Sequence, residues 1–240
     1  KMRLSHTMYR WRYGYSNCCR KKIKMKIVSI EDAIANINDG ATVMIGGFFA
    51  CGTPDPLIDA LIEKGVKDLT IICDDTDTPT TSIGKLIAND QVKKVITSHI
   101  GRNPLSGQKM QDGTMEVELC PQGTLAERIR SGGAGLGGVL TPTGVGTEVA
   151  KGKQVLNIDG KDYLLEKPLR ADFALIGATI ADEKGNLYFT ATSKNFNTVM
   201  ATAADIVIAS TELIVPIGGI QPEHVAVPYI FVDYLVGGGK

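Results

Sequence analysis

The chain is poor in the residue patterns on which metal sites and membrane segments depend. It has only three histidines, and its five cysteines form no Cys-x-x-Cys pair, which argues against a zinc site. No apolar stretch approaches the roughly 18 residues that a membrane span needs. Cys51, Cys73 and Cys120 end or follow apolar runs. We therefore expect no metal, no membrane segment, and buried reduced thiols in a cytoplasmic protein.

Motifs that would mark a catalytic nucleophile are also missing. The sequence shows no recognisable Ser-His-Asp or Cys-His arrangement. No Gly-Lys-Ser/Thr follows a glycine-rich loop, which excludes a P-loop. His99 follows a predicted strand and could act as a base, although a single histidine there is more often structural. No glutamate is marked as a nucleophile by its setting; the candidates are Glu116, Glu118, Glu127, Glu148 and Glu166.

A formal net charge of zero hides an uneven distribution of charge. Residues 1–26 contain nine of the 26 lysines and arginines and no acid, so the remainder carries 17 basic and 26 acidic side chains, a net charge of −9. An acidic body argues against nucleic acid as a partner. The basic head could be a nucleic-acid arm or a transit peptide. We interpret residues 1–24 as a non-native, disordered leader, with a natural start at Met25.

Short apolar runs alternate with amphipathic segments along residues 25–240. Ser29 is expected to cap the first helix and Asp55 the second, and Asp159–Gly160 between two apolar runs predicts a type I′ hairpin. Other expected elements are strands at 42–45, 69–73, 94–98, 116–120, 172–178 and 205–209, helices near 81–89, 123–132 and 197–204, and an ambiguous run at 230–236. The alternation predicts a single α/β domain with an open, mostly parallel sheet, helices on both faces and an inserted hairpin.

The stretch "VMIGGFFACGTPDP" at 43–56 interrupts a buried strand with glycines. It lies where ligands bind in open α/β sheets, beyond the carboxyl end of a strand and before the N-terminus of a helix. Adjacent glycines would let the backbone approach a ligand closely. A tight strand-to-helix turn also uses glycine and proline without any ligand, so both interpretations stay open on the residues alone.

Two further features lie close to predicted element ends. Gln122 follows the strand at 116–120, where its amide could bind a carbonyl or carboxylate or could simply begin a helix. The segment 131–148 is rich in glycine and follows a helix rather than a strand, which weakens a dinucleotide-binding interpretation. A structured loop against a ligand or a partner chain fits this segment better, with a flexible lid as the alternative.

The first glycine stretch also carries a recognisable motif. The segment "DGATVMIGGFFACGTP" at 39–54 consists of Asp-Gly, an apolar run, Gly-Gly-Phe, three variable residues and Gly-x-Pro, and it resembles the signature of the α subunit of class I coenzyme A transferases. The resemblance covers residues 26–237 and continues through "PQGTLAERIRSGGAGLGGVLTPTGVGT", "LRADFALIGA", "DEKGNLYF", "SKNFN" and "FVDYLV". The segment "SHIGRNPLSGQKM" looks more like the acetate/acetoacetate type than the 3-oxoadipate type.

This resemblance implies an enzyme that moves coenzyme A from an acyl-CoA to a short-chain carboxylate such as acetate, acetoacetate or butyrate. The transfer would pass through a glutamyl-CoA thioester, without a permanently bound cofactor. The family's nucleophilic glutamate belongs to a β subunit, in a Ser-Glu-Asn-Gly motif that is absent here. The resemblance therefore implies no catalytic residue in this chain and a hetero-tetramer or larger assembly with that β subunit.

The resemblance places the site residues of this chain in its glycine-rich segments. Coenzyme A is expected to contact the first glycine loop, which consists of Gly46, Gly47, Phe48, Phe49, Ala50, Cys51 and Gly52. Gln122 is expected to face the acyl or oxyanion region. The 132–138 loop, with Gly133 and Gly135, is expected to lie along the same cleft. Cys51 occupies a variable position of the motif, and its role stays open.

Two other functions are compatible with the residues alone. A stand-alone sugar-phosphate isomerase or deaminase on a related α/β sheet would also place glycine loops at strand ends. It would need an acid or base within the chain, such as His99 or a glutamate. A non-catalytic module that binds coenzyme A would need the glycine loop but no chemistry.

Overall fold

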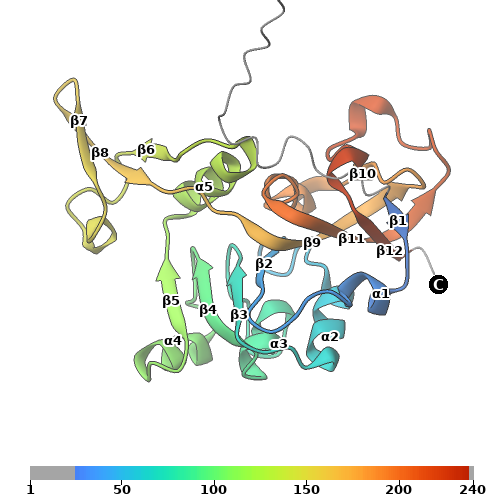
Figure 1. Ribbon diagram of the computed structural model, residues 1–240, viewed down its shortest axis with the longest axis horizontal. Coiled ribbons are helices and arrows are strands. Elements are labelled where there is room, and N and C mark those ends of the chain that lie inside the picture. Colours follow the sequence, from blue (N-terminus) through green and yellow to red (C-terminus); the bar gives the residue numbers. More distant parts are fainter. Residues whose placement is uncertain (1–24, 238–240) are drawn as a thin grey trace, which may run out of the picture.

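A nine-stranded sheet forms the centre of the computed structural model, which describes residues 25–237 (Figure 1). In spatial order its main strands are β1 (Lys26–Ile27), β12 (Tyr234–Gly237), β11 (Ala204–Val215), β9 (Ala171–Asp182), β2 (Thr42–Ile45), β3 (Leu69–Ile72), β4 (Val92–Thr97) and β5 (Glu116–Leu119). All neighbours along this path are parallel, and β10 (Leu187–Tyr188) pairs antiparallel with β9. The predicted open, mostly parallel sheet is confirmed. The predicted leader at 1–24 lies outside the described residues.

Helices cover both faces of this sheet, because its central strands bury apolar side chains on both sides. The helices are α1 (Ile30–Ile34), α2 (Asp55–Lys64), α3 (Ser82–Ala88), α4 (Pro104–Gln111), α5 (Gln122–Ala134) and α6 (Asn197–Met200). Val43 and Ile45 of β2 pack in one core cluster with side chains of α1, α2 and α3. Met44, between them, packs in a second cluster with side chains of α5 and α6. The predicted two-faced packing is confirmed.

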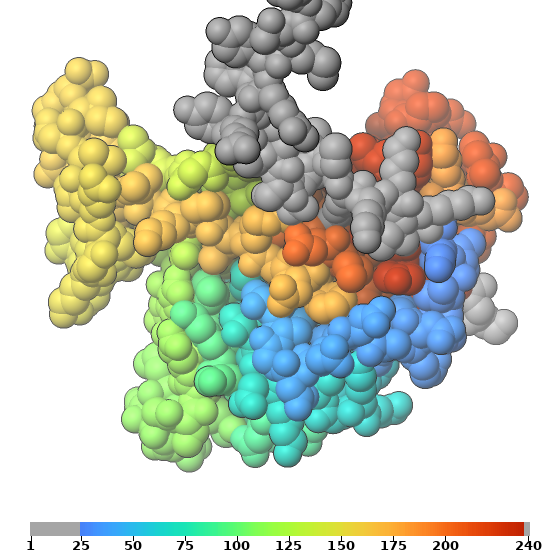
Figure 2. Space-filling model, in the orientation of Figure 1, coloured from blue at the N-terminus to red at the C-terminus, as the bar shows by residue number. Residues whose placement is uncertain are grey.

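A separate three-stranded antiparallel sheet projects from the body as an arm (Figure 2, yellow and yellow-green). Its strands, in spatial order, are β6 (Val139–Thr141), β8 (Lys161–Glu166) and β7 (Val155–Ile158). Asp159 and Gly160 join β7 to β8 with φ angles of 52° and 79°, as the predicted type I′ turn requires. Strand β6 is an addition to the predicted hairpin, because three residues between a glycine and a proline give no strand signal.

The helix starts are partly as predicted. Ser29 caps α1, its Oγ accepting a hydrogen bond from the N–H of Asp32 at 3.1 Å. The predicted cap at Asp55 is wrong, because α2 begins at Asp55 itself, and this carboxylate instead accepts a hydrogen bond from Ser82 Oγ at 2.6 Å. Helix α4 is absent from the prediction. Asn103 caps α4 and Pro104 is its first residue, so the Asn-Pro pair was the available signal.

Strands β9 and β11 are twelve residues long, about twice the predicted lengths. Strand β2 pairs with β9 only as far as Leu175, after which β9 continues beside the loop that follows β2. The N–H of Gly46 still donates to the carbonyl of Leu175, at 2.9 Å. Within residues 25–237, no helix has both the length and the apolar character that crossing a membrane requires.

Candidate functional site

The loops that follow β2, β3, β4 and β5 are joined to one another at the carboxyl edge of the parallel sheet. The N–H of Phe49, after β2, donates to Asp75 Oδ2, after β3, at 2.9 Å. Gln122, after β5, donates from Nε2 to Asp74 Oδ1 at 2.9 Å. This edge is where open α/β sheets bind ligands. The structure therefore connects the predicted glycine loop and the predicted glutamine through two aspartates of β3's loop.

The glycine loop contains a two-residue turn between Phe48 and Cys51. The N–H of Phe48 donates to the carbonyl of Cys51 at 3.1 Å, and the N–H of Cys51 to the carbonyl of Phe48 at 2.9 Å. Phe49 and Ala50 have φ angles of 46° and 60°, the pattern of a type I′ turn, in which Asn and Gly are usual. A left-handed conformation costs such residues about 1–2 kcal/mol each. The turn presents both phenylalanine rings to solvent, 37% and 38% exposed.

The glycines of this loop are required by the chain itself. A Cβ on Gly46 would lie 1.9 Å from Asn197 Oδ1, and one on Gly52 would lie 2.6 Å from the carbonyl of Ser193. Asn197 is fully buried; its Oδ1 accepts from the N–H of Gly177 at 3.0 Å, and its Nδ2 donates to the carbonyl of Gly52 at 2.9 Å. The sequence predicted that these glycines let a ligand approach the backbone closely. In the structure, α6 and the segment before it occupy that space.

Three buried aspartates follow β3 and were not among the predicted site residues. Asp74, Asp75 and Asp77 are each no more than 4% exposed. Burial raises the pKa of Asp74, while hydrogen bonds from Gln122 and Ser98 act in the opposite direction. The sequence-based candidates for an acid or base are His99 and five glutamates, and none of them is an aspartate. The signal it missed is "CDDTD", an acidic run directly after a buried strand at the ligand-binding edge.

We expect Asp77→Asn to stabilise the chain at neutral and alkaline pH. Burial, followed by the charge of Asp75, raises the pKa of Asp77 to about 6, compared with about 3.9 in an unfolded chain. Stability is therefore lost as the pH rises from about 4 to about 6, because folding then opposes ionisation of this group. The asparagine variant should avoid that loss and gain about 2–3 kcal/mol at pH 8, since one pKa unit corresponds to about 1.4 kcal/mol. Urea unfolding at pH 4 and pH 8 measures the difference.

Asp90→Asn is the matched control for this prediction, because Asp90 is also an aspartate with a positive φ angle, 54°. Its side chain is exposed and its pKa is lowered by a hydrogen bond from Lys109. This variant should show no gain in stability between pH 4 and pH 8. Equal stability of Asp77→Asn and the unchanged chain at pH 8 would contradict the assignment of an unfavourable buried charge to Asp77.

His99 and Arg102, after β4, contact the ring of Phe49. The guanidinium carbon of Arg102 lies 4.8 Å from the centre of the ring, and the imidazole of His99 meets the ring edge-on with the two centres 6.0 Å apart. Cation–π and edge-to-face contacts both favour this arrangement. His99 thus packs against the turn, which fits the structural interpretation of this histidine better than the catalytic one.

Gln122 borders a hollow of about 250 Å³ at this edge. The hollow is lined by Phe48, Gln122, Ala126, Arg130, Asn195, Phe196, Thr198 and Val199. These side chains supply amides, a hydroxyl, a guanidinium and aromatic surface, but no carboxylate, thiol or imidazole. The hollow can therefore donate hydrogen bonds to a carbonyl, carboxylate or phosphate oxygen, and its lining offers no strong nucleophile.

The predicted glycines at 133 and 135 do not lie beside Gln122. Gln122 is the first residue of α5, and Gly135 caps the other end of the helix with a φ angle of 71°, about 20 Å away at 1.5 Å per residue. Gly133 is inside α5, where a Cβ would lie 2.1 Å from Thr202 Oγ1. The expected glycine loop at 132–138 is thus wrong for its first residues, because they continue the helix and pack against the segment after α6.

Asn195 and Asn197, in the segment "SKNFN", are site residues to which the sequence assigned no role. Asn195 Nδ2 donates to the carbonyl of Cys51 at 2.9 Å, and Asn197 holds Gly52 as described. They secure the glycine loop from the side opposite β3. Because they lie more than 140 residues away in the chain, no local pattern could have paired them with the loop.

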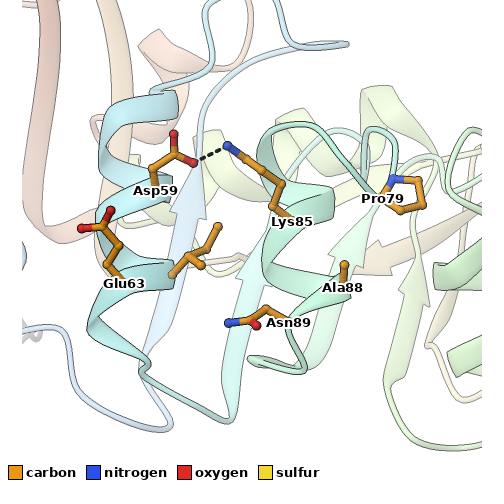
Figure 3. A pocket seen from close by; sticks show the side chains of 7 residues that line it. Asp59, Glu63, Pro79, Lys85, Ala88 and Asn89 are labelled. Carbon is orange, nitrogen blue, oxygen red and sulfur yellow. Dashed lines mark hydrogen bonds and ion pairs between the residues drawn. The ribbon is translucent and has the colours of Figure 1, made fainter.

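A second hollow, of about 480 Å³, lies between α2 and α3 (Figure 3). Asp59 of α2 and Lys85 of α3 point toward one another across it and form an ion pair. Its lining residues are Asp59, Ile62, Glu63, Pro79, Lys85, Ala88 and Asn89. It shares no residue with the hollow beside Gln122. The candidate functional site therefore remains the carboxyl edge of the sheet, where the loops after β2, β3, β4 and β5 meet.

The cysteines within residues 25–237 are unpaired. Burial raises the pKa of Cys73 and that of Cys120, so both remain protonated thiols, as expected of buried cysteines. Cys51 is only partly buried, with Sγ 3.4 Å from Thr192 Oγ1. Among the described residues, no group of three or more His, Cys, Asp or Glu side chains is arranged to hold a metal ion.

Comparison with known proteins gives a consistent result. The family model "Coenzyme A transferase" matches residues 27–238. The chain is 51% identical to acetate CoA-transferase subunit alpha of Escherichia coli K12, over 89% of this chain and 97% of that protein. It is 52% identical to the acetoacetyl-CoA:acetate/butyrate CoA transferase alpha subunit of Clostridium acetobutylicum, over 88% and 97%. A solved acyl-CoA transferase from Escherichia coli O157:H7 shares the fold, with a TM-score of 0.79 and 24% identity, over 91% of this chain and 48% of that chain.

Proposed function

The chain belongs to the coenzyme A transferase family, and from this we propose that it is the α subunit of a short-chain acyl-CoA:carboxylate transferase. The observation that carries the proposal is about 50% identity to two proteins named as such subunits, over nearly their whole length. The carboxylates in their names are acetate, acetoacetate and butyrate or their CoA esters, and we assign the same substrate class to this chain. The alternatives of a sugar-phosphate isomerase or deaminase, or of a non-catalytic module, find no support in these relatives.

In the proposed reaction, coenzyme A passes from an acyl-CoA to a free carboxylate through a glutamyl-CoA thioester on a β subunit. The carboxylate of that glutamate attacks the acyl-CoA carbonyl, which forms an acyl-glutamyl anhydride and releases the coenzyme A thiolate. The thiolate then attacks the glutamyl carbonyl and releases the first acid, which leaves the glutamyl-CoA thioester. The oxyanion formed in each attack needs hydrogen-bond donors. Gln122 is suited to donate, because an amide nitrogen has two hydrogens and only one is needed for Asp74. Asp74 and Ser98, which are hydrogen-bonded at 2.9 Å, would keep the amide of Gln122 in place.

The turn at residues 46–52 would contact coenzyme A. Its two exposed phenylalanine rings offer apolar surface, and Arg102 beside Phe49 and Arg130 in the hollow offer positive charge for phosphate groups. Coenzyme A is a substrate in this proposal, and no resident cofactor is involved. Gly133 and Gly135, at the far end of α5, have no part in this contact.

The β subunit would complete the site. The hollow beside Gln122 is lined without a carboxylate, which fits a nucleophile supplied by another chain. The two relatives at about 50% identity are named as alpha subunits, which also fits a nucleophile on a partner chain. We propose a cytoplasmic hetero-tetramer or larger assembly. Closure between two chains would exclude water, which would otherwise hydrolyse the thioester.

We expect transferase activity only when this chain is assembled with its β subunit. The purified chain alone, the β subunit alone and the co-expressed pair should be assayed for transfer from acetyl-CoA to acetoacetate or butyrate. Mass spectrometry of the pair after incubation with acetyl-CoA should find the coenzyme A adduct on the β subunit. Full activity of the isolated chain, or an adduct on this chain, would refute the division of roles.

A further inference from the structure

We propose that Asp75 is a positioning residue that holds the Phe49–Ala50 turn in its left-handed conformation. The inference rests on the proposed function in one respect, namely that this turn faces coenzyme A. Asp75 does not line the hollow beside Gln122 and is only 4% exposed. It would therefore act through the backbone of the turn and not by touching the substrate.

The two carboxylate oxygens of Asp75 are each bonded to a backbone N–H. Oδ2 accepts from Phe49 at 2.9 Å, and Oδ1 accepts from Asp77 at 2.8 Å. Asp75 itself forms a parallel bridge with His99, in the loop after β4. The bond from Phe49 joins the loop after β2 to the loop after β3, and the bond from Asp77 orients the carboxylate within its own loop. Both are charge-assisted hydrogen bonds, which are stronger than neutral ones.

The turn needs such support because its own sequence disfavours its conformation. Phe49 and Ala50 stand where a type I′ turn usually has Asn and Gly. The turn is anchored on its other side by Asn195, which donates to the carbonyl of Cys51, but that bond lies after the two strained residues. Asp75 contacts the first strained residue directly. Without it, the backbone at 49–50 would relax toward negative φ and carry the ring of Phe49 away from Arg102.

A held turn would favour binding of the substrate by preorganisation, since ordering a loop on binding costs affinity. Loss of the hydrogen bond from Phe49 to Asp75 should therefore raise the KM for acyl-CoA more than it lowers kcat. It should also leave the core packing intact, because the carboxylate of Asp75 is hydrogen-bonded to loops and not to the helices that cover the sheet. These two features separate a positioning role from a general structural one.

The test is Asp75→Ala in the assembled enzyme, together with the double variant Asp75→Ala/Ala50→Gly. The alanine variant should raise the KM for acetyl-CoA about tenfold, the size expected for one lost charge-assisted hydrogen bond. Glycine at 50 removes the penalty for positive φ, so the double variant should recover most of the loss. Hydrogen exchange of residues 47–53 in the isolated chain should become faster in Asp75→Ala and slow again in the double variant.

Asp74→Ala with and without Ala50→Gly is the matched control. Asp74 is the adjacent buried aspartate, but it contacts Gln122 and Ser98 and not the turn, so glycine at 50 should not rescue it. If Asp75→Ala does not fold, Asp75→Asn replaces it. Its amide can accept only one of the two N–H groups, and the same rescue by glycine is expected at a smaller amplitude.

The hydrogen-exchange result does not depend on catalysis, so it separates this inference from the proposed function. Unchanged exchange at 47–53 in a folded Asp75 variant overturns the inference, whatever the activity of the assembled enzyme. An equal rescue of the Asp74 and Asp75 variants by glycine also overturns it. Suppose that hydrogen exchange becomes faster in Asp75→Ala, that glycine at 50 reverses the change, and that the assembled protein has no transferase activity. This result supports the positioning role of Asp75 and overturns the proposed function.

Discussion

Replacing Gly46 with alanine should reduce both the stability of the chain and the activity of the assembled enzyme. The added Cβ would lie 1.9 Å from Asn197 Oδ1, so either the glycine loop or the buried asparagine must move. Asn197 cannot move without breaking its bonds to Gly177 and Gly52. We expect a loss of about 2–3 kcal/mol in the free energy of unfolding and about a hundredfold lower kcat/KM from displacement of the turn.

Gly107→Ala is the control for Gly46→Ala. Gly107 is inside α4, and a Cβ there has no neighbour within 4 Å. Alanine favours a helix over glycine by up to about 1 kcal/mol, so this variant should be as stable as the unchanged chain or more so. Urea unfolding and the acetyl-CoA transfer assay measure both variants. If Gly46→Ala behaves like Gly107→Ala, the packing role of Gly46 is wrong.

Replacing Arg128 with methionine should lower the free energy of unfolding by about 3 kcal/mol, because it removes a buried cation that pairs with the partly exposed Glu118 and the buried Glu166. Arg128 is 7% exposed. Its Nη1 donates to Glu118 Oε1 at 2.7 Å, and its Nε donates to the carbonyl of Lys167 at 2.9 Å. These bonds join α5 to β5 and to the segment that connects the arm to β9. Methionine keeps the apolar stem of the side chain but none of its hydrogen bonds.

Arg130→Met provides the comparison, since it removes an arginine two positions along the same helix. Arg130 is 62% exposed and pairs with Glu127 at i,i+3, and such surface pairs contribute less than about 1 kcal/mol. Chemical denaturation at pH 7 should therefore separate the two variants clearly. Similar losses in both would mean that the bonds of Arg128 contribute no more than a surface ion pair.

The Arg128 effect should depend on pH in a defined direction. Burial acts to raise the pKa of Glu118, but the hydrogen bond and charge of Arg128, with the charge of Lys94, lower it. The stability from this pairing is therefore present above the pKa of an unfolded glutamate, about 4.3, and is lost as the pH falls through the lowered value of the folded chain. The difference between the unchanged chain and Arg128→Met should narrow below about pH 4.

Most of the fold could be predicted because its signals are local. Apolar runs of four or five residues indicate buried strands, and Asp159–Gly160 indicates a tight turn, since each pattern depends on neighbours in the chain. The errors occur where a residue has a distant partner. The sequence predicts that Asp55 caps a helix, but in the structure its carboxylate accepts a hydrogen bond from Ser82. The sequence predicts a loop at 132–134, but these residues pack closely against residues 169 and 202.

The candidate site was predictable in its outline but not in its working parts. The glycine loop and Gln122 could be located because strands in a parallel sheet end at a common edge. The residues that hold them could not, because Asp75 lies 26 positions from Phe49 and Asp74 lies 48 positions from Gln122. An acidic run after a strand is by itself a weak signal of a functional site, because only the folded structure brings these aspartates next to Phe49 and Gln122.

The sequence by itself determined the class of fold, the family and the position of the glycine turn at the binding edge. These follow from periodicity, turn residues and a motif, which are properties of consecutive residues. Only the tertiary structure decided what the glycines are for. Gly46 and Gly52 make room for Asn197 and its neighbours, more than 140 residues away, and the strained turn between these glycines is held by a carboxylate from the loop after β3. Such requirements arise from packing between distant segments, which no local pattern encodes.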